Sequence, residues 1–277
     1  MLGIRLIVMD MDGTLLASDG RTIPRNNLRA LRRAADRGIR LALATGRLPD
    51  DAGFFALDAG LPMHILAING SVRVDEPLGE VVVARFIPEP SARTIAELIR
   101  VLGLRFSVSS IHEVAFSGMP PDIEAARRSQ GTFLDRPGGR IRLSLDGSRI
   151  DALLGQVNKF SIISPDADRL ARLRERVLSE TTGAEVTSSW YDNLEIIPSG
   201  VNKGSAVAEL AASLGIPMDA VMAIGDQDND IPMIAGAGIG VAVGNASPAV
   251  RDAADRVVGT NDRGGVAQAI EALALSD

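Results

Sequence analysis

Short apolar runs alternate with helix-like stretches at the two ends of the chain. The runs are Leu6–Asp10, Leu41–Thr45, Ile65–Asn69, Ala220–Asp226 and Ile239–Val243. Uninterrupted apolar runs of this length are typical of strands that are covered on both faces. Between the first two runs, Pro24–Arg37 has one apolar face, begins with proline and is followed by Gly38, which predicts a helix. The order strand, helix, strand predicts an α/β fold with a parallel, doubly wound sheet.

The middle of the chain has a different pattern. Its strand-like runs, several of them separated by tight turns, are Glu80–Ile87, Leu104–Ser109, His112–Ser117, Ile141–Leu145, Lys159–Ser164 and Ala184–Ile197. Two helix-like stretches, Ser91–Leu102 and Asp166–Ser179, lie among them. This pattern predicts an α+β unit with antiparallel hairpins. Because the parallel pattern resumes near residue 200, we expect residues 1–81 and 193–277 to form a core domain and residues 82–192 to form an inserted domain.

Composition removes several classes of function. The chain has 29 Lys and Arg against 35 Asp and Glu, a formal charge of −6, and this argues against a nucleic-acid partner. The absence of cysteine excludes disulfides, thiolate metal sites and cysteine nucleophiles. Lys159 and Lys203 are the only lysines, so arginine carries most of the positive charge. A lysine beside a motif is therefore more noticeable here than in an average sequence.

Two apolar stretches could be mistaken for targeting or membrane segments. The amino-terminal run meets Asp10 and Asp12 before a signal-peptide core could form. The uncharged stretch Ile231–Val250 contains two prolines, Asn245 and several glycines, which indicates turns and not a membrane span. We therefore expect a cytoplasmic protein without a membrane partner.

An acidic pair follows the first predicted strand. Asp10 and Asp12 are separated by one residue and precede Gly13, which permits an unusual backbone angle, and Thr14. Where the strand ends and the chain bends, the two carboxylates can share one cleft. The alternative is a solvated pair of aspartates that opens an ordinary turn.

Two further motifs offer positive charge and hydrogen-bond donors. Thr45, Gly46 and Arg47 end the second strand, and a hydroxyl, free backbone amides and a guanidinium suit an anion at a turn from strand to helix. The alternative is a surface loop in which the threonine caps a helix. Lys203 opens a later predicted helix, where its compact charge could neutralise a carboxylate and a phosphoryl oxygen. The alternative is a solvated lysine.

The last motif is an acidic cluster after the run Ala220–Asp226. Its members Asp226, Asp228, Asn229 and Asp230 offer only hard oxygen ligands, which Mg²⁺ prefers. The alternative is an acidic cap on the following helix. Since the carboxyl ends of parallel strands meet at one edge of a sheet, all four motifs are expected to converge there.

Taken together, these motifs resemble those of the haloacid dehalogenase superfamily. With the inserted middle and Ala237–Ala246, the set resembles the Cof-type subfamily of sugar-phosphate phosphatases. The resemblance covers residues 1–80 and 195–277, and it extends to the inserted domain only in position and α+β character. It implies a Mg²⁺-dependent phosphatase that hydrolyses small phosphate monoesters, with sugar phosphates the expected class, through an aspartyl-phosphate intermediate.

The resemblance also implies roles for individual residues. Asp10 would be the nucleophile, Asp12 the general acid and then the general base, and Lys203 would neutralise charge. The substrate would meet Thr14, Thr45, Gly46, Arg47 and Asn69. The metal would be bound by Asp10, by the backbone carbonyl of Asp12 and by the acidic cluster. The members of that cluster at the metal would be Asp226, Asn229 and Asp230. Asp230 would also orient metal-bound waters or Lys203.

Alternatives remain open at this point. A phosphomutase of the same superfamily would transfer the phosphoryl group between two positions of a sugar. A second alternative is a non-enzymatic phospho-acceptor switch, which also combines acidic residues, a threonine and a lysine. A third is a glycosyltransferase with an Asp-x-Asp metal site, but that function would leave Asp226–Asp230 without a role. Lys159 either projects from the inserted sheet towards the cleft or is solvated. The expected partner is a small phosphorylated metabolite, and the pattern predicts neither its identity nor the oligomeric state.

Overall fold

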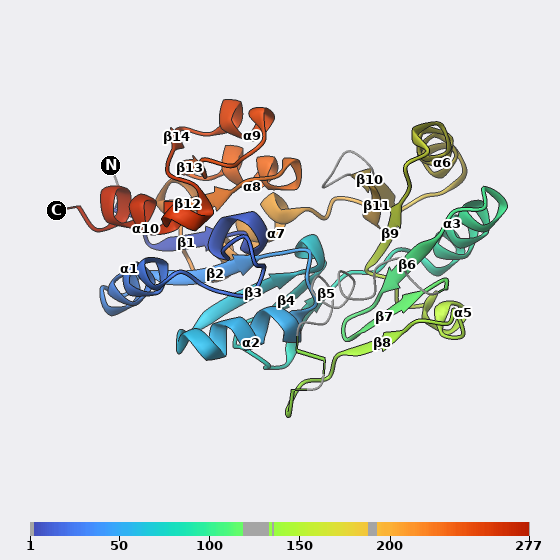
Figure 1. The fold of residues 1–277 in the computed structure, drawn as a ribbon, viewed down its shortest axis with the longest axis horizontal. Coiled ribbons are helices and arrows are strands. Elements are labelled where there is room, and N and C mark those ends of the chain that lie inside the picture. The colour runs from blue at the N-terminus through green and yellow to red at the C-terminus, as the bar shows by residue number, and fades with distance from the viewer. Residues whose placement is uncertain (1–2, 119–132, 135, 188–192, 277) are drawn as a thin grey trace.

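The computed structural model describes residues 3–118, 133–134, 136–187 and 193–276. These residues form two β-sheets (Figure 1). Each sheet has its own hydrophobic core. The larger sheet is built from both ends of the chain, and the smaller sheet is built from the middle. The strands of the smaller sheet thus lie in sequence between the two parts of the chain that build the larger sheet.

Eight strands form the larger sheet. They are Leu6–Met9 (β1), Arg40–Ala44 (β2), Met63–Ala67 (β3), Val72–Val74 (β4), Val81–Ala84 (β5), Val221–Gly225 (β12), Ile239–Ala242 (β13) and Arg256–Val257 (β14). Their order is β14-β13-β12-β1-β2-β3-β4-β5. Neighbours from β14 to β3 are parallel, whereas β4 and β5 are antiparallel to their neighbours. The predicted parallel α/β class and the five predicted strands are confirmed.

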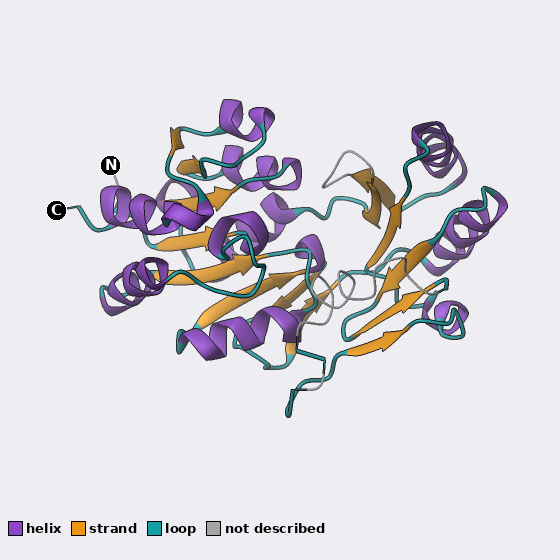
Figure 2. Ribbon diagram, in the orientation of Figure 1, coloured by secondary structure: helices purple, strands orange, loops and turns teal. Residues whose placement is uncertain are grey.

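Helices flank this sheet (Figure 2). They are Arg25–Asp36 (α1), Pro49–Ala59 (α2), Lys203–Ser213 (α7), Ile231–Gly236 (α8), Pro248–Ala253 (α9) and Gly265–Ala269 (α10). Helix α1 contacts α10, α2 contacts β3, and α7 contacts α8. Every residue of β1 is fully buried between such layers, which explains why its sequence is an unbroken apolar run. None of the described helices is long and apolar enough to cross a membrane.

The smaller sheet has six strands. They are Phe106–Ser109 (β6), Glu113–Phe116 (β7), Arg142–Ser144 (β8), Lys159–Ile163 (β9), Ala184–Thr187 (β10) and Asn193–Pro198 (β11). They lie in the order β10-β11-β9-β6-β7-β8, and all neighbours are antiparallel except β7 and β8. Helices Glu89–Val101 (α3), Ile150–Leu153 (α5) and Ala167–Glu180 (α6) belong to this unit. The predicted run Ala184–Ile197 is therefore two paired strands, and residues 188–192 between them lie outside the described residues.

Two of the expected domain boundaries do not coincide with the points where the chain passes from one sheet to the other. The boundary at 81/82 falls inside β5, which pairs with β4 of the larger sheet, and the run Glu80–Ile87 therefore does not belong to the inserted sheet. The boundary at 192/193 falls just before β11, which pairs with β9 of the smaller sheet. By strand pairing, the inserted unit begins after Ala84 and ends at Pro198. Pairing partners are distant in sequence, so local patterns do not reveal them.

Candidate active site

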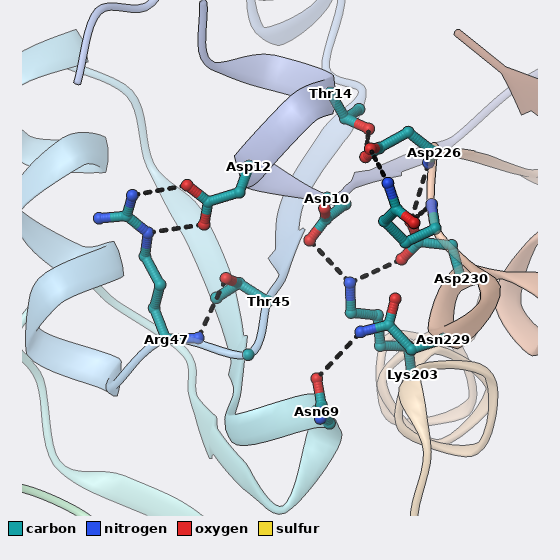
Figure 3. A network of polar contacts seen from close by, with 12 residues as sticks. Asp10, Asp12, Thr14, Thr45, Arg47, Asn69, Lys203, Asp226, Asn229 and Asp230 are labelled. Carbon is teal, nitrogen blue, oxygen red and sulfur yellow. Dashed lines mark hydrogen bonds and ion pairs between the residues drawn. The ribbon is translucent and has the colours of Figure 1, made fainter. Parts of the chain in front are cut away.

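Polar residues at the ends of four strands meet in one place. Asp10 follows β1, Thr45 follows β2, Asn69 lies in the turn after β3, and Asp226 follows β12 (Figure 3). They line a cavity of about 640 Å³. Of the residues expected at the site, the cavity is lined by Asp10, Asp12, Thr45, Gly46, Arg47, Asn69, Lys203, Asp226 and Asn229, whereas Thr14 and Asp230 lie behind it.

Lys203 is held between two aspartates. Its Nζ donates hydrogen bonds to Asp10 Oδ1 at 2.7 Å and to Asp230 Oδ1 at 2.6 Å (Figure 3). Asn202 and Ser205 form a capping box that fixes the start of α7 at Lys203. Burial alone would lower the pKa of Lys203, but the charges of Asp10 and Asp230 outweigh burial and raise it. The ammonium is therefore a permanent positive charge in the site.

The carboxylates nevertheless carry more negative charge than Lys203 compensates. Burial raises the pKa of Asp10 well above its ordinary value; Lys203 opposes this, and Asp230, Asp226 and Asp12 add to it. Burial also raises the pKa of Asp226 to about 6, although Thr14 donates a hydrogen bond of 2.6 Å to its Oδ1. Uncompensated buried carboxylates of this kind are stabilised when a cation binds.

The donor set fits a magnesium ion. Carboxylate oxygens of Asp10, Asp226 and Asp230 lie within 4.8 Å of one another. Asp230 is already engaged: Oδ1 accepts from Lys203, and Oδ2 accepts from the backbone N–H groups of Asp226 and Gln227. Asp10 and Asp226 line the cavity whereas Asp230 does not, so Asp10 and Asp226 are the best placed ligands. The buried Oδ1 of Asn229 has no hydrogen-bond partner among the described residues. It adds an amide oxygen to the carboxylate oxygens of this loop, and Mg²⁺ prefers hard oxygen ligands of both kinds.

Arg47 holds Asp12. Its Nε and Nη2 donate to the two carboxylate oxygens of Asp12 at 2.8 and 2.6 Å, and Nη1 donates to Asp51 at 2.8 Å. Burial would lower the pKa of Arg47, but both aspartates raise it. The guanidinium, only 2% exposed, also lies 5.0 Å from the ring centroid of Phe55. Arg47 lines the cavity as expected, but its guanidinium is directed at the Asp12 carboxylate and not into the cavity.

The two threonines support neighbouring groups. Thr14 was expected to meet the substrate, but it is fully buried and its hydroxyl donates to Asp226, because the turn of residues 11–15 packs its side chain behind the acidic cluster. Thr45 lines the cavity, and its hydroxyl oxygen accepts the backbone N–H of Arg47 at 3.2 Å. The hydroxyl proton of Thr45 is then available to an anion.

Two residues of the smaller sheet complete the cavity. Lys159 on β9 lies in the cleft, which settles the choice between cleft and solvent, and its Nζ donates to Glu195 Oε1 at 2.8 Å. Glu195 was missed by sequence reasoning. The signal available was an acidic residue inside the apolar run of β11, where it is buried.

Comparisons with known proteins agree with this geometry. Residues 7–270 match the model of the haloacid dehalogenase-like hydrolase family. The 5-amino-6-(5-phospho-D-ribitylamino)uracil phosphatase YcsE of Bacillus subtilis is 31% identical over 270 residues, which cover 96% of this chain and 94% of the relative. The HMP-PP phosphatase of Cronobacter sakazakii is 35% identical over 249 residues, which cover 88% and 85%.

Among solved structures, a haloacid dehalogenase-like hydrolase from Bacteroides thetaiotaomicron superimposes with a TM-score of 0.80. It is 30% identical, and the match covers 97% of this chain and 98% of that one. The similarity therefore includes the inserted unit as well as the larger sheet.

Proposed function

Because the chain belongs to the family of haloacid dehalogenase-like hydrolases and is a phosphatase of small phosphorylated metabolites, we propose that it hydrolyses sugar phosphates with the help of Mg²⁺. The reaction passes through a phosphorylated Asp10. One observation carries this proposal: Asp10 comes from one end of the chain, Lys203 and Asp226 come from the other, and all three line one cavity.

Two carboxylates divide the chemistry. A carboxylate oxygen of Asp10 attacks phosphorus, the bond from phosphorus to the leaving oxygen breaks, and Asp12 gives its proton to that oxygen. Asp12 then takes a proton from a water molecule, which attacks the phosphorus of the aspartyl phosphate, so that inorganic phosphate leaves and Asp10 is restored. In this structure Arg47 donates to both oxygens of Asp12, a contact that an ionised carboxylate makes. One of these oxygens has to leave Arg47 and take up a proton before Asp12 can act as the acid.

Positive charge is needed at both steps. A phosphate dianion approaching Asp10, Asp12 and Asp226 meets three carboxyl groups, and Lys203 offsets only part of that charge. Mg²⁺, held by Asp10, Asp226 and the backbone carbonyl of Asp12, would neutralise charge on the transferring phosphoryl group. Thr45 and the backbone beside Gly46 donate to the phosphoryl oxygens.

The rest of the cavity supports a polyhydroxylated leaving group. Among the described residues that line it, Ala17 carries the only apolar side chain. Such a surface offers hydrogen bonds and, within the described part of the chain, no aromatic side chain on which a ring could stack. The printed name of the Bacillus subtilis relative includes a phosphorylated ribityl chain, which is a polyol. Sugar phosphates are the class that this chemistry favours.

The decisive experiment is a phosphate-release assay with a panel of sugar phosphates, nucleotides and aromatic phosphates. We expect release that needs Mg²⁺ and stops in EDTA, and a fall of about 1,000-fold or more in kcat for Asp10→Asn. Asp252→Asn removes an exposed carboxylate of α9 and serves as the control. Normal Mg²⁺-dependent turnover by folded Asp10→Asn would overturn the assignment. A phosphomutase would instead move the phosphoryl group within a sugar without releasing phosphate.

A further inference from the structure

The two lysines of the chain line the same cavity, and the proposed chemistry at phosphorus uses only Lys203. Lys159 is 2% exposed and its ion-pair partner Glu195 is 6% exposed. In the register of β9 and β11, Glu195 lies opposite Ser161, so Lys159 stands two residues along on the same face of the sheet. A buried ion pair offers little net stability, because desolvation offsets the attraction. Its place in the cavity calls for another role.

Each member of this pair is tied to the larger sheet. Lys159 Nζ also donates to the carbonyl oxygen of Gly46 at 3.3 Å. Glu195 Oε2 accepts from Asn69 Nδ2 at 2.9 Å. A Cβ atom on Gly46 would lie 3.2 Å from Asn69 Oδ1 and 3.5 Å from Lys159 Nζ, so glycine leaves the room that this contact needs. The pair therefore bridges the inserted unit and the loops that would bind the phosphoryl group.

The turn that presents Asn69 is strained. Ile68 and Asn69 have φ angles of 48° and 56°, and neither is glycine. Such a conformation costs about 1–2 kcal/mol per residue and is unusual for a β-branched side chain. The turn is fixed by hydrogen bonds from Ile68 N to Arg47 O and from Asn69 N to Thr45 O. The turn places the side-chain amide of Asn69 between two groups: Nδ2 donates to Glu195, and Oδ1 accepts from Asn229 Nδ2 at 3.4 Å. The contact with Asn229 can be followed in Figure 3.

The pair keeps capacity for a ligand. An ammonium has three donors, and Lys159 uses two of them among the described residues. The Glu195 carboxylate accepts one hydrogen bond on each oxygen and has further lone pairs. A donor and an acceptor side by side match two neighbouring hydroxyl groups, one of which accepts from Lys159 while the other donates to Glu195.

We propose that Lys159 and Glu195 form a subsite that selects neighbouring hydroxyl groups of the leaving group, and that Asn69 and Gly46 position this subsite from the larger sheet. The inference rests on the proposed function, because it names the residues that would give that reaction its preference for a sugar. Selectivity then exists only while the inserted unit is seated on the larger sheet.

The test compares two esters in steady-state kinetics: the sugar phosphate that the protein hydrolyses fastest, and phenyl phosphate, which has no hydroxyl groups. The measured quantity is the ratio of their kcat/KM values. In Lys159→Gln/Glu195→Gln, both charges are removed together so that no buried charge is left alone, and we expect the ratio to fall about 10- to 100-fold, mainly through KM for the sugar phosphate. The matched control Arg176→Gln/Glu180→Gln removes an exposed ion pair of α6 and should leave the ratio unchanged.

A second variant pair tests the role of Asn69. Asn69→Asp places a carboxylate against Glu195 and should lower the ratio. Combining it with Glu195→Gln keeps the total charge and lets the introduced amide donate to the introduced carboxylate, so part of the ratio should return. A purely structural role of this hydrogen bond predicts that both variants change the two kcat/KM values in parallel and leave their ratio unchanged.

The outcomes separate the two proposals. If the unchanged protein releases no phosphate from either ester, the proposed function fails and the subsite fails with it. If it hydrolyses both, but the variants lose both activities equally, or the ratio does not move, the subsite alone is refuted. A lowered ratio together with rescue supports it.

Discussion

Replacing Asp226 by asparagine should stabilise the protein when no metal is bound, although it removes a residue that would bind the metal. Burial raises the pKa of this carboxyl group to about 6, against an ordinary value of 3.8. Asparagine has nearly the same shape and can still accept the hydrogen bond from Thr14. The substitution therefore removes a charge that the folded protein holds at a cost and keeps the shape of the side chain. Its one loss is the hydrogen bond of 3.2 Å that Gln227 Nε2 donates to Asp226 Oδ2.

The sign follows from proton binding. As pH rises through about 4, the unfolded chain loses the Asp226 proton while the folded protein keeps it, so stability falls. The fall is complete once pH exceeds about 6, the pKa in the folded protein. A difference of about two pH units corresponds to about 3 kcal/mol. Asp226→Asn has no such loss, and about 3 kcal/mol corresponds to a gain of roughly 5–10 °C in melting temperature for a chain of this size.

The assay is thermal unfolding in EDTA at several pH values, repeated with Mg²⁺. At about pH 7.5 in EDTA, Asp226→Asn should melt higher than the unchanged protein, and the difference should vanish near pH 4. Mg²⁺ at about 100 times its dissociation constant should add about 2.7 kcal/mol to the unchanged protein and little to the variant. The exposed Asp252→Asn is the control. A variant that melts lower in EDTA at pH 7.5, or a difference that ignores pH, would refute the reasoning.

Two further substitutions probe how the site is held. Arg47→Lys keeps the positive charge but loses the two parallel hydrogen bonds to Asp12. We therefore expect kcat to fall about 10- to 100-fold, with a smaller change in KM. A change that is mainly a rise in KM would instead mean that Arg47 binds the substrate directly. Gly70→Ala places a Cβ 2.7 Å from the Cβ of Ala206 on α7, and should lower melting temperature and kcat together. Gly38→Ala is the control, because Gly38 has a φ of 80° against 93° for Gly70 but open space around it. It should show only the backbone cost of about 1–2 kcal/mol, and equal losses in both variants would contradict a packing effect.

The larger sheet could be predicted from sequence because its central strands are buried on both faces. The whole of β1 is inaccessible to solvent, and only apolar residues are tolerated there. A polar residue directly after such a run, such as Asp10 or Asp226, lies at the carboxyl edge of the sheet, where ligands of open α/β sheets bind. Local pattern and topology together therefore located the cavity.

The partners of individual side chains could not be predicted in the same way. Sequence reasoning identified Arg47 as a cation beside an anion site, but its actual partners are Asp12, which is 35 residues away, and Asp51 on α2. Which carboxylate a guanidinium binds depends on how loops pack in three dimensions. The edge strand β5 was misassigned for the same reason, since its strand pairing and not its composition decides its sheet.

The distribution of the two kinds of cation explains why lysine is rare here and yet central. Surface ion pairs, such as that of Arg176 with Glu180, use arginine, whose planar fork binds a carboxylate through two parallel contacts. Lys203 lies between Asp10 and Asp230, which belong to different elements, and its ammonium donates one hydrogen bond to each of them. Two single contacts in different directions suit a compact ammonium. Arg47 is the converse case, because holding both oxygens of Asp12 requires the fork. The choice between lysine and arginine in this cavity thus follows from whether a group must be neutralised or oriented.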